Sequence, residues 1–238
     1  MIKNISQSQI NLFKHCPYAY ALRYIHKKEG IWFDPSIIEV GSRVHDAIDI
    51  YYKNYYLANG TEEQIKNQVY EILRNKWTDN SLPAKYLQKA YTCVCNFAKF
   101  EKHMLKGRRM KPLTEVKIYN DGLMGIVDYL DLNTPKIVDF KTNTRAGVGY
   151  NEKIQAVMYK ILIKKEYDID LPYFTLQYLF PGETRVVKYD NKVMEVEADL
   201  YNNIEYIKGA WDSKMFPKKP RTPKACNSCQ YNYYCGGV

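Results

Sequence analysis

Residues 125–142 have the sequence GIVDYLDLNTPKIVDFKT, in which two short apolar runs flank a turn-forming Asn-Thr-Pro. Each run has the length and the β-branched content of an interior strand, and each leads into an aspartate. If the runs pair as an antiparallel hairpin around this turn, the numbers of facing residues sum to 267. Asp128 and Asp139 then face each other, with Cβ atoms about 5 Å apart.

Two carboxylates this close repel each other unless a cation or a proton lies between them. Carboxylate oxygens are the ligands that suit Mg²⁺ or Mn²⁺. Lys141 lies two residues beyond Asp139 and projects to the same face of the strand. A metal held here would polarise a phosphate and activate water, and the ammonium would stabilise developing charge. The alternative is a surface hairpin with scattered charges. The apolar runs argue against it, because a buried aspartate needs a partner.

The residues before this hairpin are mostly helical in pattern. Ser6 is a candidate N-cap, and residues 61–64 form a capping box, with Thr at the N-cap and Gln three residues later. Apolar residues recur at helical spacing over the first 110 residues. We expect helices at 5–25, 37–58, 61–77 and 83–105.

The period changes after residue 110. Turn signals separate short strands, and a helix follows them before a second hairpin. We expect strands at 112–121, 123–132 and 136–141, a helix at 150–167, a hairpin of 172–180 with 184–190, and a helix at 195–212. The last 25 or so residues are expected to be irregular. The fold class is therefore α/β, with a small mixed sheet flanked by helices and an N-terminal helical elaboration.

Four motifs in order give these residues a known context. They are Gly41-Ser42-Arg43-Val44-His45, Gly125-Ile126-Val127-Asp128, Asp139-Phe140-Lys141-Thr142 and Gln155-x3-Tyr159. The chain resembles the RecB-like branch of the PD-(D/E)XK nuclease superfamily. The resemblance implies a restriction-endonuclease-like core in one domain spanning 1–238, with a mainly helical part (1–110), a catalytic sheet core (111–190) and a C-terminal helix plus Cys-rich segment (191–238).

The same resemblance assigns roles to the site residues. It implies that His45, Asp128 and Asp139 hold a catalytic Mg²⁺ or Mn²⁺ with help from the Phe140 carbonyl, and that Lys141 positions water or stabilises the transition state. Gln155 and Tyr159 lie four residues apart on one helix face, near the site and the DNA. Taken alone, His45 is more typical of a core histidine, and these two are typical of an ordinary amphipathic helix. Glu115 could join the site, although an ion pair or a supporting role is more typical.

The six cysteines include a C-x2-C-x5-C motif at Cys226, Cys229 and Cys235. A fourth ligand would come from Cys16, Cys93 or Cys95. The last two lie mid-helix and point apart, so we interpret them as small apolar residues. Spacing alone leaves Zn²⁺ and an iron–sulfur cluster open. Iron–sulfur members of the branch, such as AddB-type subunits and the CRISPR-associated protein-four family, pair a lone N-terminal Cys with this motif. That resemblance implies a [4Fe–4S] cluster on Cys16, Cys226, Cys229 and Cys235, with Zn²⁺ or [2Fe–2S] as the alternative.

A formal net charge of +9 favours a polyanionic partner, nucleic acid before membrane. Basic runs contain Lys218, Lys219 and Arg221 near the C-terminus, and Arg108 and Arg109 before the first strand. Such runs are often plain solvated surface, but they suit phosphate contacts that carry no sequence information. No apolar run approaches the ~18 residues of a membrane span. The first residues lack an apolar signal core, so we expect a cytoplasmic protein with reduced thiols.

These observations lead to competing functions. The first is a metal-dependent DNA exonuclease acting on single-stranded ends, in recombination, repair, phage DNA metabolism or CRISPR adaptation. The second is a non-catalytic DNA-binding iron–sulfur subunit of a larger complex, and the third is an RNA-processing nuclease. The sequence has no G-x4-G-K-[ST] motif, so any unwinding would come from a helicase partner; an integrase-type partner is the other candidate.

Overall fold

The computed structural model describes residues 4–31, 34–77, 82–106 and 110–236. Its centre is a five-stranded sheet in the order β1-β2-β3-β4-β5. The strands are β1 (Leu113–Asn120), β2 (Leu123–Asp131), β3 (Lys136–Lys141), β4 (Tyr173–Tyr178) and β5 (Glu183–Lys188). Only β3 and β4 pair in parallel; the other neighbours are antiparallel. The predicted α/β class with a small mixed sheet is confirmed, and it is consistent with a restriction-endonuclease-like core.

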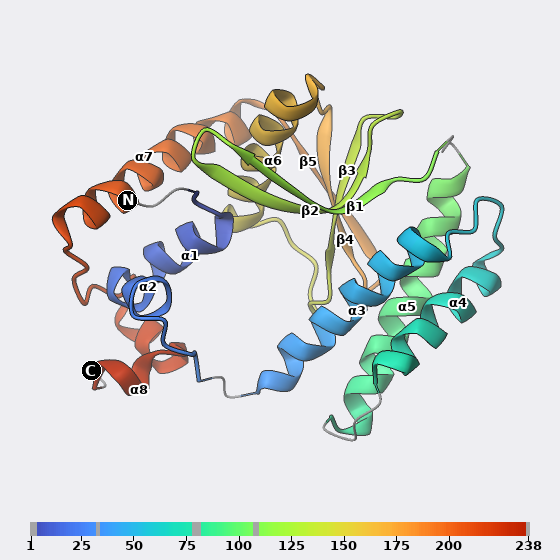
Figure 1. Ribbon diagram of the computed structural model, residues 1–238, viewed down its shortest axis with the longest axis horizontal. Coiled ribbons are helices and arrows are strands. Elements are labelled where there is room, and N and C mark those ends of the chain that lie inside the picture. The colour runs from blue at the N-terminus through green and yellow to red at the C-terminus, as the bar shows by residue number, and fades with distance from the viewer. Residues whose placement is uncertain (1–3, 32–33, 78–81, 107–109, 237–238) are drawn as a thin grey trace.

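Helices cover both faces of this sheet (Figure 1). They are α1 (Gln7–His15), α2 (Pro17–Tyr24), α3 (Pro35–Asn54), α4 (Glu62–Lys76), α5 (Ala84–Leu105), α6 (Tyr150–Tyr167) and α7 (Asn191–Ser213). Apolar residues of α6 and α7 form one core with the sheet. Residues of α3, α4 and α5 form a second core against Tyr129, Val138 and Phe140. The strands therefore pass between two packed layers, which places polar strand residues in partly buried surroundings.

The first predicted helix is wrong as a single element. Its N-cap is as expected, since the Ser6 side chain accepts a hydrogen bond from the Gln9 amide. However, Cys16 has an extended backbone, with φ −167° and ψ 121°, and the chain restarts as α2 at Pro17. Proline disfavours helical geometry in the residue before it and fits the first turn of a helix. The break therefore follows from Cys16-Pro17. The capping box predicted at Thr61 and Gln64 is confirmed.

The β2–β3 hairpin has the predicted register. The pairs Tyr129↔Val138, Leu130↔Ile137 and Asp131↔Lys136 each sum to 267. The Asp131 carboxylate closes the turn by accepting hydrogen bonds from the backbone amides of Asn133 and Thr134, at 2.9 and 3.2 Å. The register is thus set by local turn chemistry.

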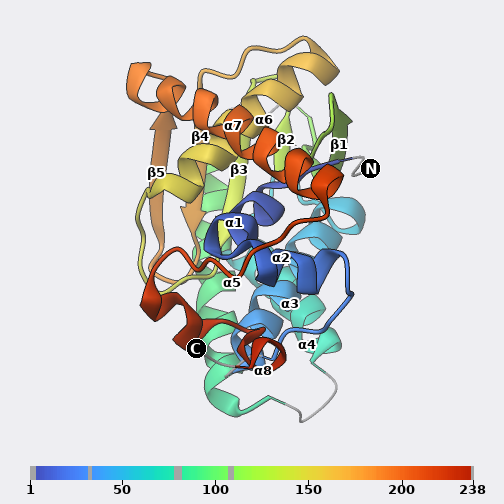
Figure 2. The ribbon, with the colours of Figure 1, turned by 90° about the vertical axis from the view of Figure 1, so that its left-hand side faces the viewer.

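The C-terminal segment is more regular than predicted. It contains a 3-10 turn, η1 (Pro223–Ser228), and the one-turn helix α8 (Asn232–Cys235). The segment lies beside α1 and α2 (Figure 2), because the Arg221 amide donates to the His15 carbonyl at 2.9 Å and the Ile31 amide to the Gln230 carbonyl at 2.8 Å. The two ends of the chain therefore form one lobe. Across the described ranges, no helix has the length and apolar character needed to cross a membrane.

Candidate metal and catalytic site

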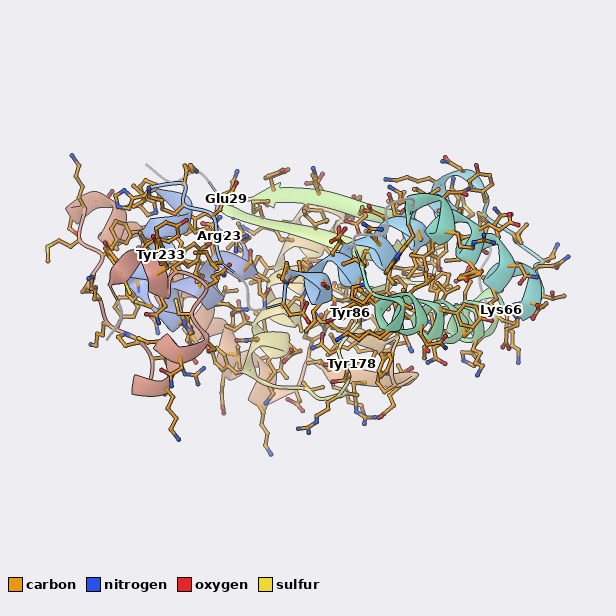
Figure 3. The ribbon with its side chains drawn as sticks, turned by 90° about the horizontal axis from the view of Figure 1, so that it is seen from below. Arg23, Glu29, Lys66, Tyr86, Tyr178 and Tyr233 are labelled. Carbon is orange, nitrogen blue, oxygen red and sulfur yellow. The ribbon has the colours of Figure 1, made fainter. Side chains whose placement is uncertain are left out.

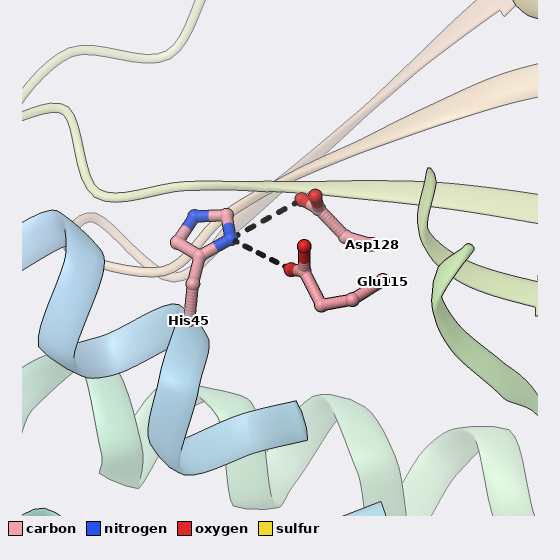
Figure 4. Close-up of side chains that lie close together, drawn as sticks. All are labelled: His45, Glu115 and Asp128. Atoms are coloured by element: carbon pink, nitrogen blue, oxygen red, sulfur yellow. Dashed lines mark ion pairs between the residues drawn. The ribbon is translucent and has the colours of Figure 1, made fainter. Parts of the chain in front are cut away.

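Three side chains from three different elements converge at one edge of the sheet (Figure 4). They are His45 from α3, Glu115 from β1 and Asp128 from β2, and one ligand atom from each lies within 4.8 Å of the others. The His45 Nδ1 atom is 3.5 Å from Asp128 Oδ2 and 3.9 Å from Glu115 Oε1. All three side chains are partly buried. One imidazole and two carboxylates are suitable ligands for Mn²⁺ or Mg²⁺.

Glu115 has an unusual backbone. Its φ is +49°, in the left-handed region, and it lies between the paired residues Thr114↔Tyr129 and Val116↔Val127. A non-glycine residue in this conformation is uncommon and costs of order 1–3 kcal/mol. The sequence alone favours an ion pair or a supporting role for Glu115. A signal was present, because the β1–β2 register sums to 243 and so places Glu115 opposite Asp128.

Asp139 is the centre of a second group of side chains next to the first. The Gln155 Nε2 atom of α6 donates to Asp139 Oδ1 at 2.6 Å. The Lys141 Nζ atom lies 2.8 Å from Asp139 Oδ2 and donates to Gln155 Oε1 at 3.1 Å. Asp139 Oδ2 is buried, and the Lys141 ammonium is its ion-pair partner among the described residues. A carboxylate has about four lone-pair sites, so Asp139 can still bind a cation beside Gln155 and Lys141.

Tyr159 joins α6 to β2. Its hydroxyl accepts a hydrogen bond from Gln155 Nε2 at 3.2 Å and donates to the Ile126 carbonyl. The close approach requires a glycine in β2, because a Cβ added to Gly125 would lie 2.7 Å from Tyr159 Cε1. Gly125, from the second sequence motif, thus makes room for Tyr159, from the fourth.

Phe140 contributes through its backbone and its ring. Its amide donates to Asp128 Oδ2 at 2.7 Å, which fixes the rotamer of that carboxylate across the hairpin. Its buried ring packs edge-on against Phe97 and Phe100 and lies 6.5 Å from the His45 ring. Phe140 therefore connects the site to the α3–α5 core.

The electrostatics of the site favour a bound cation. Burial raises the pKa of Asp128 well above its usual range, and the Asp139 charge raises it further. Burial also raises the pKa of Glu115, whereas it lowers that of His45 despite the nearby carboxylates. For Lys141, burial opposes the charged form, but Asp139 outweighs it and the pKa is raised. The site thus combines carboxylates that are costly to ionise, a neutral imidazole and a persistent ammonium.

The four cysteines of the predicted cluster come together at the lobe formed by the chain ends. Cys16, at the break between α1 and α2, lines one pocket with Cys226, Cys229 and Cys235. Burial raises the pKa of the Cys229 thiol, and the charges of the other three raise it further. Cys93 is buried within α5, as predicted, and burial raises its pKa to about 12, whereas Cys95 is only half-buried.

Three of the five predicted DNA-contacting residues can be placed in the structure, and all three are exposed. Lys218, Lys219 and Arg221 are exposed on the segment that follows α7. Lys218 also has a local contact, since its Nζ atom donates to the Cys235 carbonyl at 2.8 Å. Arg108 and Arg109 lie outside the described residues.

The family model described as the PD-(D/E)XK nuclease superfamily matches residues 4–236. Among solved structures, the crystal structure of SSO0001 is similar with a TM-score of 0.44 and 14% sequence identity, over 98% of this chain and 86% of that chain. No curated protein matches the sequence.

Proposed function

Because the chain belongs to the PD-(D/E)XK nuclease superfamily, we propose that it is a metal-dependent DNA exonuclease that acts on single-stranded ends. The observation that carries the proposal is that two groups of polar side chains lie next to each other in one site. His45, Glu115 and Asp128 form a candidate ligand set, and Asp139 lies beside them with Lys141 and Gln155.

The donor set fits a divalent cation. His45, Asp128 and Asp139 would hold it, with the Phe140 carbonyl implied by family resemblance and Glu115 added from the geometry. Asp139 keeps lone pairs for a metal beside Gln155 and Lys141, and a cation would relieve the cost of ionising Asp128. Bound Mg²⁺ or Mn²⁺ supplies Lewis-acid polarisation of a phosphate and a more acidic water.

The protein's own groups hold the substrate and the charges. Lys141 keeps its proton, because Asp139 outweighs the effect of burial on its pKa. It therefore acts as a hydrogen-bond donor to water or to a phosphate oxygen, and not as a general base. Gln155 holds both Asp139 and Lys141, and Tyr159 holds Gln155. These two residues of α6 orient the Asp139 and Lys141 side chains before the substrate arrives.

We assign Cys16, Cys226, Cys229 and Cys235 to a [4Fe–4S] cluster of the RecB-like type. Four thiols in one pocket support the assignment. Four Cys suit both Zn²⁺ and an iron–sulfur cluster, and the resemblance to iron–sulfur members of the RecB-like branch favours the cluster. The cluster's role is structural, because it joins the two chain ends and hydrolysis needs no electrons.

The substrate is tested with protein purified without oxygen. End-labelled single-stranded DNA, double-stranded DNA and RNA are incubated with Mn²⁺, Mg²⁺ or EDTA. The proposal predicts metal-dependent loss of single-stranded DNA from one end, with label position giving the polarity. Preferential RNA cleavage would replace the DNA assignment. If cluster-containing protein binds DNA but cuts nothing, the chain is the non-catalytic subunit of a complex whose helicase or integrase-type partner must be sought.

A further inference from the structure

Two cavities lie beside α1 and share two of their lining residues. The first, of about 210 Å³, lies between the start of α1 and residues Ile126 and Tyr159 of the sheet layer. The second, of about 340 Å³, lies between α1, Arg23 of α2 and Gln230 of the C-terminal segment. Gln7 and Ser8 line both. The two cavities therefore adjoin at the first turn of α1, and together they are called the α1 groove below.

The α1 groove begins next to the candidate catalytic site. Tyr159 lines its first cavity, and the hydroxyl of Tyr159 accepts from the same Gln155 amide that donates to Asp139. Two hydrogen bonds thus connect the wall of the groove to a candidate metal ligand. From there the groove leads past the first turn of α1 to the lobe of the chain ends.

The lining chemistry suits a nucleic-acid strand. Gln7, Asn11 and Gln230, which carry side-chain amides, line the second cavity together with Arg23. Of the described residues that line either cavity, none is acidic. Amides pair with the edges of bases, and a guanidinium pairs with phosphate. Asn11 lines the second cavity, and its Oδ1 atom is buried with no hydrogen-bond partner among the described residues.

We propose that the α1 groove binds an unpaired nucleic-acid strand that runs from the catalytic site toward the Cys-rich segment. Bases lie against the amides of Gln7, Asn11 and Gln230, and a phosphate lies against Arg23, which projects on the lobe of the chain ends (Figure 3). The second cavity falls in the range of roughly 300–1,000 Å³ that is usual for small-ligand sites, so it accommodates a unit of nucleotide size. The inference rests on the proposed nuclease function and adds a strand-binding site to it.

Ser8→Asp provides a test that preserves the fold. Ser8 is exposed in the first turn of α1 and lines both cavities. A carboxylate in a first turn favours the helix, so the variant is expected to fold. In the groove, the same charge repels a polyanionic strand. Asn191→Asp is the matched control, because it adds the same charge to the first turn of α7. That turn is at the opposite end of α7 from Trp211, which contacts Tyr20 of α2.

Binding is measured by fluorescence anisotropy with a 5′-labelled 12-nucleotide oligothymidine in EDTA and 50 mM salt. We expect the Kd to rise at least five-fold in Ser8→Asp and to stay within two-fold of wild type in Asn191→Asp. The Gln7→Ala/Asn11→Ala double variant, which tests the amides without adding charge, should raise the Kd at least three-fold. A wild-type Kd in both groove variants would overturn the proposal, as would equal weakening in Ser8→Asp and the control.

Because EDTA prevents cleavage, this result is independent of the catalytic proposal. A wild-type protein that binds the strand through the α1 groove but does not cut it with Mn²⁺ contradicts the nuclease assignment and leaves the groove intact. If the wild-type protein cuts DNA while both groove variants bind the strand normally, the α1 groove proposal is contradicted and the nuclease assignment is kept.

Discussion

The Phe140 amide donates a 2.7 Å hydrogen bond to Asp128 Oδ2, one step beyond the last paired residues of the β2–β3 hairpin. Pairing ends at Tyr129↔Val138, so the next register position would bring Asp128 and Asp139 face to face. At this position the Phe140 backbone amide of β3 donates to the Asp128 carboxylate, while Gln155 and Lys141 contact the Asp139 carboxylate. Each acidic group thus has its own support, and both remain in one site.

Asp128 predicts a stability that depends on pH and metal. Its raised pKa means that, as pH rises above the ordinary aspartate value, the unfolded chain releases a proton that the folded chain retains. The free energy of unfolding therefore falls as pH rises from the ordinary aspartate pKa to the raised pKa of Asp128. Above the raised pKa, the full cost of burying the charged Asp128 is present. Without metal at pH 7.5, Asp128→Asn should raise Tm, by about 2–4 °C for each kcal/mol relieved. Mn²⁺ should raise the Tm of wild type and have little effect on the variant. A lower Tm in metal-free Asp128→Asn would contradict this electrostatic account.

A side chain at position 125 is expected to disturb the packing of α6 against β2. A Cβ at this position would meet Tyr159 and Leu162 of α6 at under 3.0 Å. Gly125→Ala should therefore move Tyr159 and lower cleavage at least ten-fold. Gly209→Ala is the control, because a Cβ there meets nothing within 4 Å, and it should stabilise α7 by about 0.5–1 kcal/mol. Activity and thermal unfolding measured side by side separate the two. Full activity in Gly125→Ala would show that the Tyr159 contact does not matter.

Glu115 predicts a contribution to metal affinity. Glu115→Gln keeps the shape and removes one of the two carboxylates in the cluster with His45. The Kd for Mn²⁺, measured by calorimetry, should rise several-fold with folding unchanged. Asp121→Asn is a suitable control, since Asp121 also has a positive φ but lies in the β1–β2 turn. Equal Mn²⁺ affinity in wild type and Glu115→Gln would exclude Glu115 from the ligand set.

The cysteine assignment predicts a loss of cluster and of stability together. Cys235→Ser should abolish the brown absorbance and lower Tm, because the lobe of the chain ends loses its link. Cys95→Ser, on half-buried α5 surface, should retain both. Iron and zinc analysis of each protein gives the metal directly. Zinc at one atom per chain, with no iron, would replace the cluster assignment by a Zn²⁺ site.

Much of this could be predicted because it is local. The 267 register follows from turn chemistry and strand length, and Thr61 and Gln64 cap α4 through neighbouring atoms. Periodicity does not predict the break at Cys16, because the apolar pattern continues through Pro17. The β1–β2 register places Glu115 opposite Asp128, but the left-handed backbone of Glu115 cannot be predicted from the side-chain pattern. The α1 groove depends on which distant segments pack together, which periodicity does not determine.

The most direct test of the central claim is single-turnover cleavage of end-labelled single-stranded DNA by wild type and Asp139→Asn. The substitution retains the shape of a residue that Gln155 and Lys141 hold in place, so folding should persist. We predict cleavage by wild type with Mn²⁺, none with EDTA, and at least a hundred-fold slower rate in Asp139→Asn. Cleavage by Asp139→Asn at the wild-type rate, or cleavage that persists in EDTA, would contradict the account.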